Sequence, residues 1–184
     1  MKILGYLFLF LISLPIFSNP FKIDLTQDCK LENCTPRTWY LNDSFDSTFL
    51  NLTSPPQDWK ETKQFPIWLN KFFQKEGNLW TYTMLSFFDL PDDIAINRQT
   101  GIRLGEIGEV FEIYINGNLI ASEGEMNDGK IILHRTVRGK VFEFDKTILQ
   151  PQNNTLLIKI SGDPRFDHTG FYLTKGYTIG LYED

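Results

Sequence analysis

The chain has 184 residues, 18 of them basic and 23 acidic, and a formal net charge of −5. Nucleic acids and anionic membrane surfaces need a basic field on the protein that binds them, so this charge argues against both as partners. Aromatic residues make up 15% of the chain, and such side chains supply both β-sandwich cores and flat faces for stacking against sugars.

The N-terminus predicts a secretory signal peptide over residues 1–18. Lys2 provides a positive start, the stretch after it is almost wholly apolar, and Ser18 is small enough to precede a cleavage site. An uncleaved membrane anchor is disfavoured, because the apolar stretch is interrupted by Pro15 and falls short of the ~20 residues that a spanning helix needs. We therefore expect an exported protein, periplasmic or on the extracellular face of the cytoplasmic membrane, with one domain over residues 19–184.

Two cysteines, Cys29 and Cys34, lie close together in the sequence. In an exported protein this pair predicts a small disulfide loop that ties the start of the domain. A zinc site is less favoured, because zinc needs two further ligands and the histidines, His134 and His168, are far away in the sequence.

The rest of the chain predicts an all-β fold, because short strand-like segments alternate with clusters of Gly, Pro, Asn and Asp. Strands are expected over residues 38–41, 79–90, 102–107, 110–116, 119–122, 131–134, 140–145, 155–161, 171–174 and 177–182. This many short strands favour a two-sheet antiparallel β-sandwich. Residues 66–74 fit either a short helix or an irregular strand, and their periodicity does not decide between the two.

The segment 110–116 has the clearest strand pattern. Phe111, Ile113 and Ile115 alternate with more polar residues, which is the period of a strand with one buried face. Asn116 and the glycine after it tolerate positive φ values, so they predict a type I′ turn into a partner strand.

The loop over residues 162–170 is the best candidate ligand-binding site, because it gathers charged and aromatic residues between two predicted strands. Arg165 can form a forked pair with a carboxylate or with sugar hydroxyls, and His168 can donate or accept a proton near neutral pH. Asp163 and Asp167 complete the set, and with backbone carbonyls they also suit calcium, although no ordered run of ligands accompanies them. An internal Asp–Arg ion pair that closes the turn is the alternative to a ligand site.

The tryptophans offer indole faces on which a sugar can stack, and most are expected in the core. Trp80 lies on one side of its strand with Tyr82 and Met84, a pattern that fits burial beneath the other sheet. Trp59 lies in a polar stretch, is expected to be exposed, and joins the candidate ligand-binding residues. An exposed tryptophan also fits a contact with another protein.

The sequence predicts no catalytic residue and no cofactor. A glycosidase needs two carboxylates about 5 to 10 Å apart across a sugar cleft. The glutamates are expected to be solvated rather than placed across a cleft; the ones considered are Glu106, Glu109, Glu112, Glu123 and Glu125. No nucleophile elbow, P-loop or H-E-x-x-H motif is present.

Several blocks, taken in order, resemble the galactose-binding-domain-like β-sandwich, and in particular the sugar-binding domain of glycoside hydrolase family 2. Residues 79–91 resemble its strand that ends in Leu-Pro, residues 102–118 its strand pair that ends in Asn-Gly, and residues 142–160 the pair that follows. The resemblance covers roughly residues 37–182. It implies a jelly-roll sandwich that binds carbohydrate and is not itself catalytic, since the barrel of these hydrolases is absent.

Residues 170–184 resemble the final strand of the extracytoplasmic domain of bacterial seven-transmembrane receptors with diverse intracellular signalling modules. This resemblance implies a ligand-sensing domain that binds a small molecule, a carbohydrate or a carboxylate, and is followed by a membrane region. Two alternatives stay open. One is a freestanding carbohydrate-binding module or accessory domain of a glycosidase, and the other is a protein-interaction domain that forms receptor homodimers.

Overall fold

The computed structural model describes residues 22–30, 33–77, 79–91, 100–163 and 169–181. The predicted signal peptide lies outside these residues, as do three candidate ligand-binding residues, Arg165, Asp167 and His168. Within the described ranges, no helix is both long enough and apolar enough to cross a bilayer.

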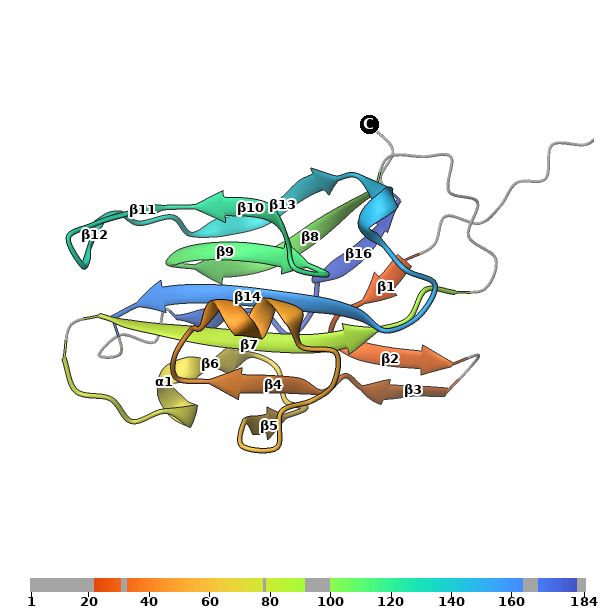
Figure 1. Cartoon of the computed structure of the whole chain (residues 1–184), viewed down its shortest axis with the longest axis horizontal. Helices are drawn as coiled ribbons and strands as arrows, with labels where there is room; N and C mark the ends of the chain where they lie inside the picture. The colour runs from red at the N-terminus through yellow and green to blue at the C-terminus, as the bar shows by residue number, and fades with distance from the viewer. Residues whose placement is uncertain (1–21, 31–32, 78, 92–99, 164–168, 182–184) are drawn as a thin grey trace, which may run out of the picture.

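The molecule consists of two antiparallel six-stranded sheets packed face to face (Figure 1). The first contains β1 (Lys22–Asp24), β6 (Ile67–Trp68), β8 (Thr100–Gly108), β13 (Val137–Phe144), β15 (Gly170–Phe171) and β16 (Thr178–Leu181). Its order is β1-β16-β8-β15-β6, and β13 also pairs with β8.

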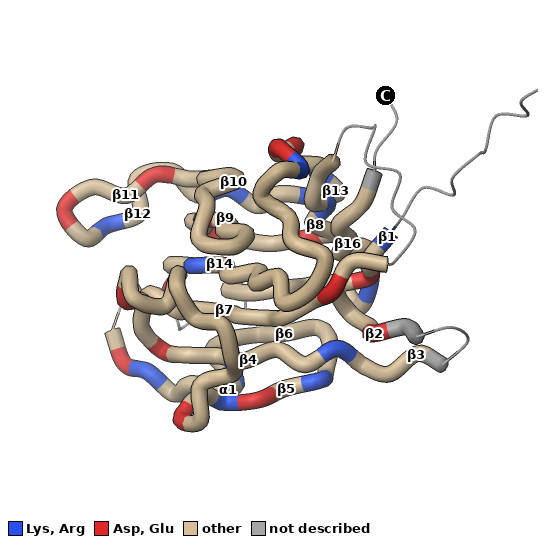
Figure 2. Tube along the Cα trace, turned by 45° about the vertical axis from the view of Figure 1, so that its right-hand side comes forward, with Lys and Arg blue, Asp and Glu red and all other residues tan. Residues whose placement is uncertain are grey.

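The second sheet contains β4 (Trp39–Asn42), β5 (Lys60–Thr62), β7 (Trp80–Phe88), β9 (Val110–Ile115), β10 (Asn118–Glu123) and β14 (Asn154–Gly162), in the order β10-β9-β14-β7-β4-β5. Two hairpins extend from the body (Figure 2), β2 (Gln27–Lys30) with β3 (Asn33–Pro36), and β11 (Glu125–Asn127) with β12 (Lys130–Leu133). The helices are single turns, η1 (Ser47–Asn51), α1 (Leu69–Phe72) and η2 (Lys146–Ile148).

The predicted all-β, two-sheet antiparallel sandwich is confirmed. Each strand expected from the sequence overlaps an observed strand, and residues 66–74 contain both structures that their periodicity allowed, the two-residue strand β6 followed by the one-turn helix α1. The turn between β9 and β10 also forms as predicted, because Asn116 and Gly117 have φ values of 49° and 76°.

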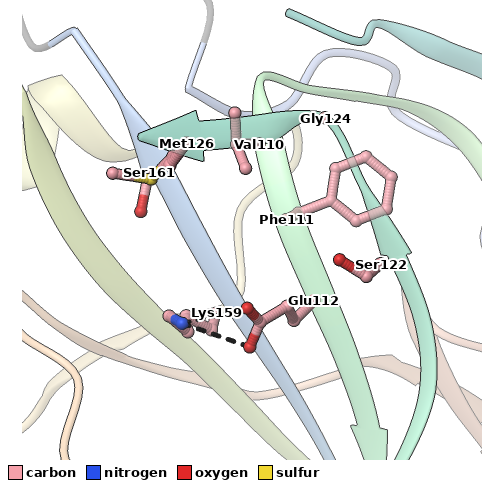
Figure 3. A pocket seen from close by; sticks show the side chains of 8 residues that line it. All are labelled: Val110, Phe111, Glu112, Ser122, Gly124, Met126, Lys159 and Ser161. Carbon is pink, nitrogen blue, oxygen red and sulfur yellow. Dashed lines mark hydrogen bonds and ion pairs between the residues drawn. The ribbon is translucent and has the colours of Figure 1, made fainter. Parts of the chain in front are cut away.

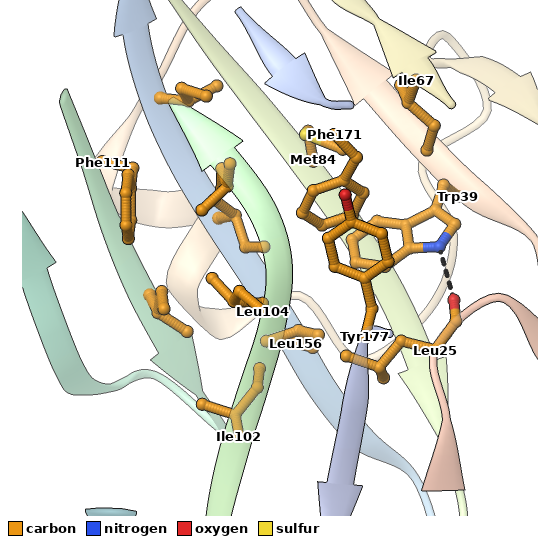
Figure 4. Packing of buried hydrophobic residues seen from close by; sticks show 14 of the residues in the cluster. Leu25, Trp39, Ile67, Met84, Ile102, Leu104, Phe111, Leu156, Phe171 and Tyr177 are labelled. Atoms are coloured by element: carbon orange, nitrogen blue, oxygen red, sulfur yellow. Dashed lines mark hydrogen bonds between the residues drawn. The ribbon is translucent and has the colours of Figure 1, made fainter. Parts of the chain in front are cut away.

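The main core lies between the two sheets (Figure 4). Phe111, Ile113 and Ile115 all point into it, as their alternation predicts. Trp39, the largest side chain of the core, is fully buried there. Its indole nitrogen donates to the carbonyl oxygen of Leu25 at 3.0 Å, which holds the chain after β1 against the core.

A second apolar cluster covers part of the outer face of the second sheet. The segment over residues 44–59, which includes η1, crosses in front of β14 and β7 (Figure 1). Trp59 packs there against Leu85 and Leu157 and makes an edge contact with Phe49 at 4.9 Å. The expected exposure of Trp59 is therefore wrong, since only 8% of the residue is accessible.

The predicted disulfide loop falls in the β2–β3 hairpin. Cys34 is disulfide-bonded, no cysteine of the described chain is free, and Cys29 lies directly opposite it in the ladder. Arg37 follows this hairpin and is almost fully buried, donating to the carbonyl oxygen of Phe87 at 2.7 Å. The hairpin is thus tied to the body of the sandwich.

Candidate functional site

A row of polar side chains crosses four strands on the outer face of the second sheet. Ser122 on β10 is paired with Glu112 on β9, Glu112 with Lys159 on β14, and Lys159 with Thr83 on β7. Directly paired residues project to the same face of an antiparallel sheet, so these side chains are neighbours.

A second row, polar except for Val110 on β9, lies beside the first, nearer the end where β14 finishes. Val110, Ser161 and Thr81 are paired across β9, β14 and β7. The hydroxyl oxygens of Thr81 and Ser161 are 2.8 Å apart and share a hydrogen bond. The two rows together form a polar floor on a sheet whose other face is the apolar core.

The segment over residues 44–59 covers one edge of this floor, at Thr83 and Lys159. The ring of Phe45 stacks on that of Tyr114 with 6.4 Å between centroids, and the ammonium of Lys159 lies 4.9 Å from the Phe45 centroid. Thr83 marks the same boundary, because it is buried and its hydroxyl donates to the carbonyl oxygen of Ser44. The outer face is therefore divided into a covered aromatic half and a polar half in which Glu112, Lys159 and Ser122 are accessible.

The accessible half contains a hollow of about 240 Å³, named here the outer hollow (Figure 3). The residues that line it come from three strands and from the β11–β12 hairpin with the glycine before it: Val110, Phe111, Glu112, Ser122, Gly124, Met126, Lys159 and Ser161. Gly124 lets that hairpin approach, since it has a φ of +82° and a Cβ there would lie 2.9 Å from Val110 Cγ2.

An ion pair lies at the centre of the outer hollow. The ammonium of Lys159 is 3.0 and 3.2 Å from the two carboxylate oxygens of Glu112. Their side chains are 28% and 29% accessible, so a ligand can reach both. The hydroxyl of Tyr114 donates to the same carboxylate, and burial, then this hydrogen bond, raises the pKa of Tyr114 to about 12. Tyr114 therefore remains a neutral donor that orients Glu112.

Three of the other glutamates considered in the sequence, Glu106, Glu109 and Glu123, have structural partners, and Glu125 is exposed as expected. Glu106 accepts from Arg138 Nε at 2.9 Å, and Glu123 pairs with Lys140. The expected solvation of Glu109 is wrong, because the residue is only 6% accessible, with His134 Nδ1 3.2 Å from its carboxylate. Glu109 lies between β8 and β9, at the corner where the chain passes from the first sheet to the second.

The sequence-predicted loop over residues 162–170 begins at the edge of the outer hollow. Asp163 lies two residues beyond Ser161 and is 8% accessible. Together with burial and the charge of Asp43, its negative charge raises the pKa of Tyr82 to about 12. Arg165, Asp167 and His168 lie outside the described residues, and Trp59 belongs to the covered half of the sheet.

The sequence reasoning missed the ion pair at the centre of the outer hollow. Glu112 and Lys159 each place a charge within an apolar alternation, but Glu112 is expected only to be solvated and Lys159 is not among the candidate residues. Opposite charges on two predicted strands are a usable signal, but the pairing register that joins them is not visible in one sequence.

No group of three or more His, Cys, Asp or Glu within the described ranges is arranged to hold a metal ion. The calcium site considered at Asp163 and Asp167 is not tested by this finding, because Asp167 is not among the described residues.

No model of a known protein family matches this chain, and no curated protein matches it. A β-glucuronidase from Ruminococcus gnavus in complex with D-glucuronic acid is similar in structure, with a TM-score of 0.55 and 16% identity over 89% of this chain and 30% of that chain. A crystal structure of the Ruminococcus gnavus enzyme gives a TM-score of 0.55 and 16% identity over 89% of this chain and 29% of that chain. The Bifidobacterium dentium β-glucuronidase gives a TM-score of 0.49 and 16% identity over 79% of this chain and 21% of that chain.

At this identity the likeness shows a shared fold, the β-sandwich present in these enzymes. The chain spans less than a third of their length.

Proposed function

We propose that this chain is a non-catalytic carbohydrate-binding domain and that the outer hollow is its binding site. The observation that carries the proposal is the accessible Glu112–Lys159 pair, which offers both acceptors and donors, with the exposed hydroxyl of Ser122 beside it. Ligand sites combine apolar surface with a few convergent polar groups. Met126 contributes such an apolar surface to the hollow.

The shared fold supports this proposal. β-Sandwich domains of this shape occur within β-glucuronidases, one of which is in complex with D-glucuronic acid. In the chain described here, the polar groups gather on one accessible face of the sandwich and pair mainly with one another. This arrangement suits recognition through hydrogen bonds.

Within this proposal, we assign the chain a more specific role, as the ligand-sensing extracytoplasmic domain of a membrane-anchored bacterial receptor. The apolar leader, the disulfide bond of Cys34 and the resemblance of residues 170–184 support it. The end of β14, whose residues Lys159 and Ser161 line the outer hollow, and the end of β16 also lie towards opposite ends of the molecule in Figure 1. A freestanding carbohydrate-binding module would use the same site without a membrane region.

Thermal shift measurements and isothermal titration calorimetry with a panel of monosaccharides and disaccharides test the proposal. A ligand that binds only the folded protein raises its Tm, so we expect at least one sugar to do so. The double variant Glu112→Ala/Lys159→Ala should lose this shift.

The matched control is Glu123→Ala/Lys140→Ala, which removes another cross-strand ion pair, one between β10 and β13, and leaves the outer hollow intact. We expect this variant to keep the sugar-induced shift. Equal loss in both double variants, or no shift with any sugar in the unaltered protein, would contradict the proposed function.

A further inference from the structure

The charges of the outer hollow balance. Among the residues that line it, Glu112 and Lys159 are the ionisable ones, and the others have apolar or hydroxyl side chains or none. One carboxylate and one ammonium give the floor a net charge of zero. A charged ligand therefore gains no net attraction from the floor, while it must give up part of its own hydration.

The geometry of the pair disfavours an anionic ligand. The Lys159 ammonium is within 3.2 Å of both Glu112 oxygens, so its charge is already neutralised by a close partner. A ligand carboxylate that approached Lys159 would also approach Glu112, and like charges at such distances repel. Pulling the pair apart would leave Glu112 partly buried without its cation, which is costly.

The geometry of the pair disfavours a cationic ligand as well. An ammonium group that approached Glu112 would lie close to the Lys159 ammonium. Tyr114 restricts the carboxylate further, because its hydroxyl donates to one of the Glu112 oxygens and its ring is stacked against Phe45. Glu112 is therefore not free to swing away from Lys159 towards an amino group.

A neutral hydroxyl group can use the pair without breaking it. A carboxylate has about four lone-pair sites and an ammonium has three N–H donors, so both keep unused capacity in the observed contacts. A pair of neighbouring sugar hydroxyls can donate to Glu112 and accept from Lys159, while the exposed hydroxyl of Ser122 can do either. The volume of about 240 Å³ is below the roughly 300–1,000 Å³ of pockets for drug-sized ligands, which limits the site to about one sugar ring.

We propose that the outer hollow selects a neutral sugar unit with neighbouring hydroxyls and discriminates against both uronic acids and amino sugars. This inference rests on the proposed function, because it names the ligand class of the same site. The ion pair acts as a charge filter that rejects ligands of either sign.

Calorimetry with matched triplets tests the filter. Each triplet contains a neutral sugar, its uronic acid and its 2-amino sugar, in the gluco and galacto series, at pH 7 and fixed ionic strength. In the unaltered protein, we expect the neutral member of the best triplet to bind at least about tenfold more tightly than either charged member, which corresponds to about 1.4 kcal/mol.

Two single variants should reverse the preference in opposite directions. Glu112→Gln leaves the Lys159 cation uncompensated and should improve uronate binding relative to the neutral sugar by about tenfold. Lys159→Gln leaves the Glu112 carboxylate uncompensated and should improve amino-sugar binding by a similar factor. Circular dichroism establishes that each variant is folded, and either variant alone tests the idea if the other does not fold.

Tighter binding of a uronic acid than of the neutral sugar by the unaltered protein would overturn the charge filter while leaving carbohydrate binding in place. A folded Glu112→Gln or Lys159→Gln protein that prefers the neutral sugar as strongly as the unaltered protein would also overturn the charge filter. Absence of binding by every member of both triplets, and by the wider panel, would instead overturn the proposed function and this inference with it.

Discussion

Asn116, in the turn that ends β9, connects three parts of the chain through its side chain. Its amide nitrogen donates to the carbonyl oxygen of Ile148 at 2.7 Å and to Asn154 Oδ1 at 2.9 Å, and its amide oxygen accepts from the backbone nitrogen of Thr155 at 2.8 Å. We expect Asn116→Asp to lower the free energy of unfolding by about 2–3 kcal/mol, because a carboxylate cannot donate and would face two oxygens. Urea titration at pH 7 measures the loss.

Asn127→Asp is the matched control, since Asn127 is exposed on β11 and the substitution adds the same charge. We expect it to change the free energy of unfolding by less than about 0.5 kcal/mol. An equal loss in both variants would mean that added negative charge, and not the lost donors, destabilises the Asn116→Asp protein.

The burial of the Tyr177 hydroxyl predicts a loss of stability at alkaline pH. The residue is fully buried, its hydroxyl donates to the carbonyl oxygen of Glu106 at 2.7 Å, and burial raises the pKa of Tyr177 to about 12. Because this pKa lies above the unfolded value of about 10, the folded state holds its proton longer. The stabilisation is complete below about pH 10 and is lost as the pH rises through 12, up to about 2–3 kcal/mol.

Urea titrations between pH 8 and 12 measure this dependence. Tyr177→Phe should lower the free energy of unfolding at pH 8 by about 1–2 kcal/mol and flatten its decline above pH 10. The decline should not vanish, because burial also raises the pKa of Tyr82 and of Tyr114 to about 12. Tyr40→Phe, at a partly exposed position, is the control and should leave most of the decline unchanged.

The segment that covers the outer sheet face, residues 44–59, is held by aromatic contacts. Trp59 contacts the ring of Phe49 and packs over Leu85 and Leu157. Trp59→Ala should lower the free energy of unfolding by about 3–5 kcal/mol, and Trp59→Phe by less. Because Trp59 does not line the outer hollow, Trp59→Phe should leave sugar affinity unchanged in calorimetry. A folded Trp59→Phe protein that no longer binds sugar would show that Trp59 does take part in ligand binding.

The longer strands were predictable because each contains several repeats of a two-residue period and ends at turn residues. β1, β5 and β6 have two or three residues each, which is too short for a period to show. Trp59 was misjudged for a related reason. Its neighbours in sequence are polar, while the apolar residues that bury it, Leu85 and Leu157, come from other strands.

The outer hollow was less predictable than the fold because it depends on strand register. Glu112 and Lys159 are far apart in sequence and become neighbours only because β9 and β14 pair with these residues opposite each other. A shift of one residue would turn one of the two side chains into the core. The predicted loop nevertheless starts beside the hollow, since both lie where β14 ends.

At the scale of the whole molecule, both sheets contribute to one main core. Leu104 on β8 of the first sheet is fully buried in the same cluster as Phe111 and Ile158 of the second sheet. A shared core predicts cooperative unfolding, with one transition seen by both circular dichroism and tryptophan fluorescence. Leu104→Ala should then shift that transition to lower urea with an unchanged slope, by about 3–4 kcal/mol.

Ile132→Ala provides the contrast, because Ile132 is 60% exposed on the β11–β12 hairpin. It should change the free energy of unfolding by less than about 0.5 kcal/mol, since little apolar surface there is removed from water in the folded state. The two signals should also stay coincident in Leu104→Ala, because Trp39 in the core and Trp59 in the outer cluster pack on opposite faces of the same sheet. Separate transitions for the two signals would mean that the outer cluster unfolds independently of the core.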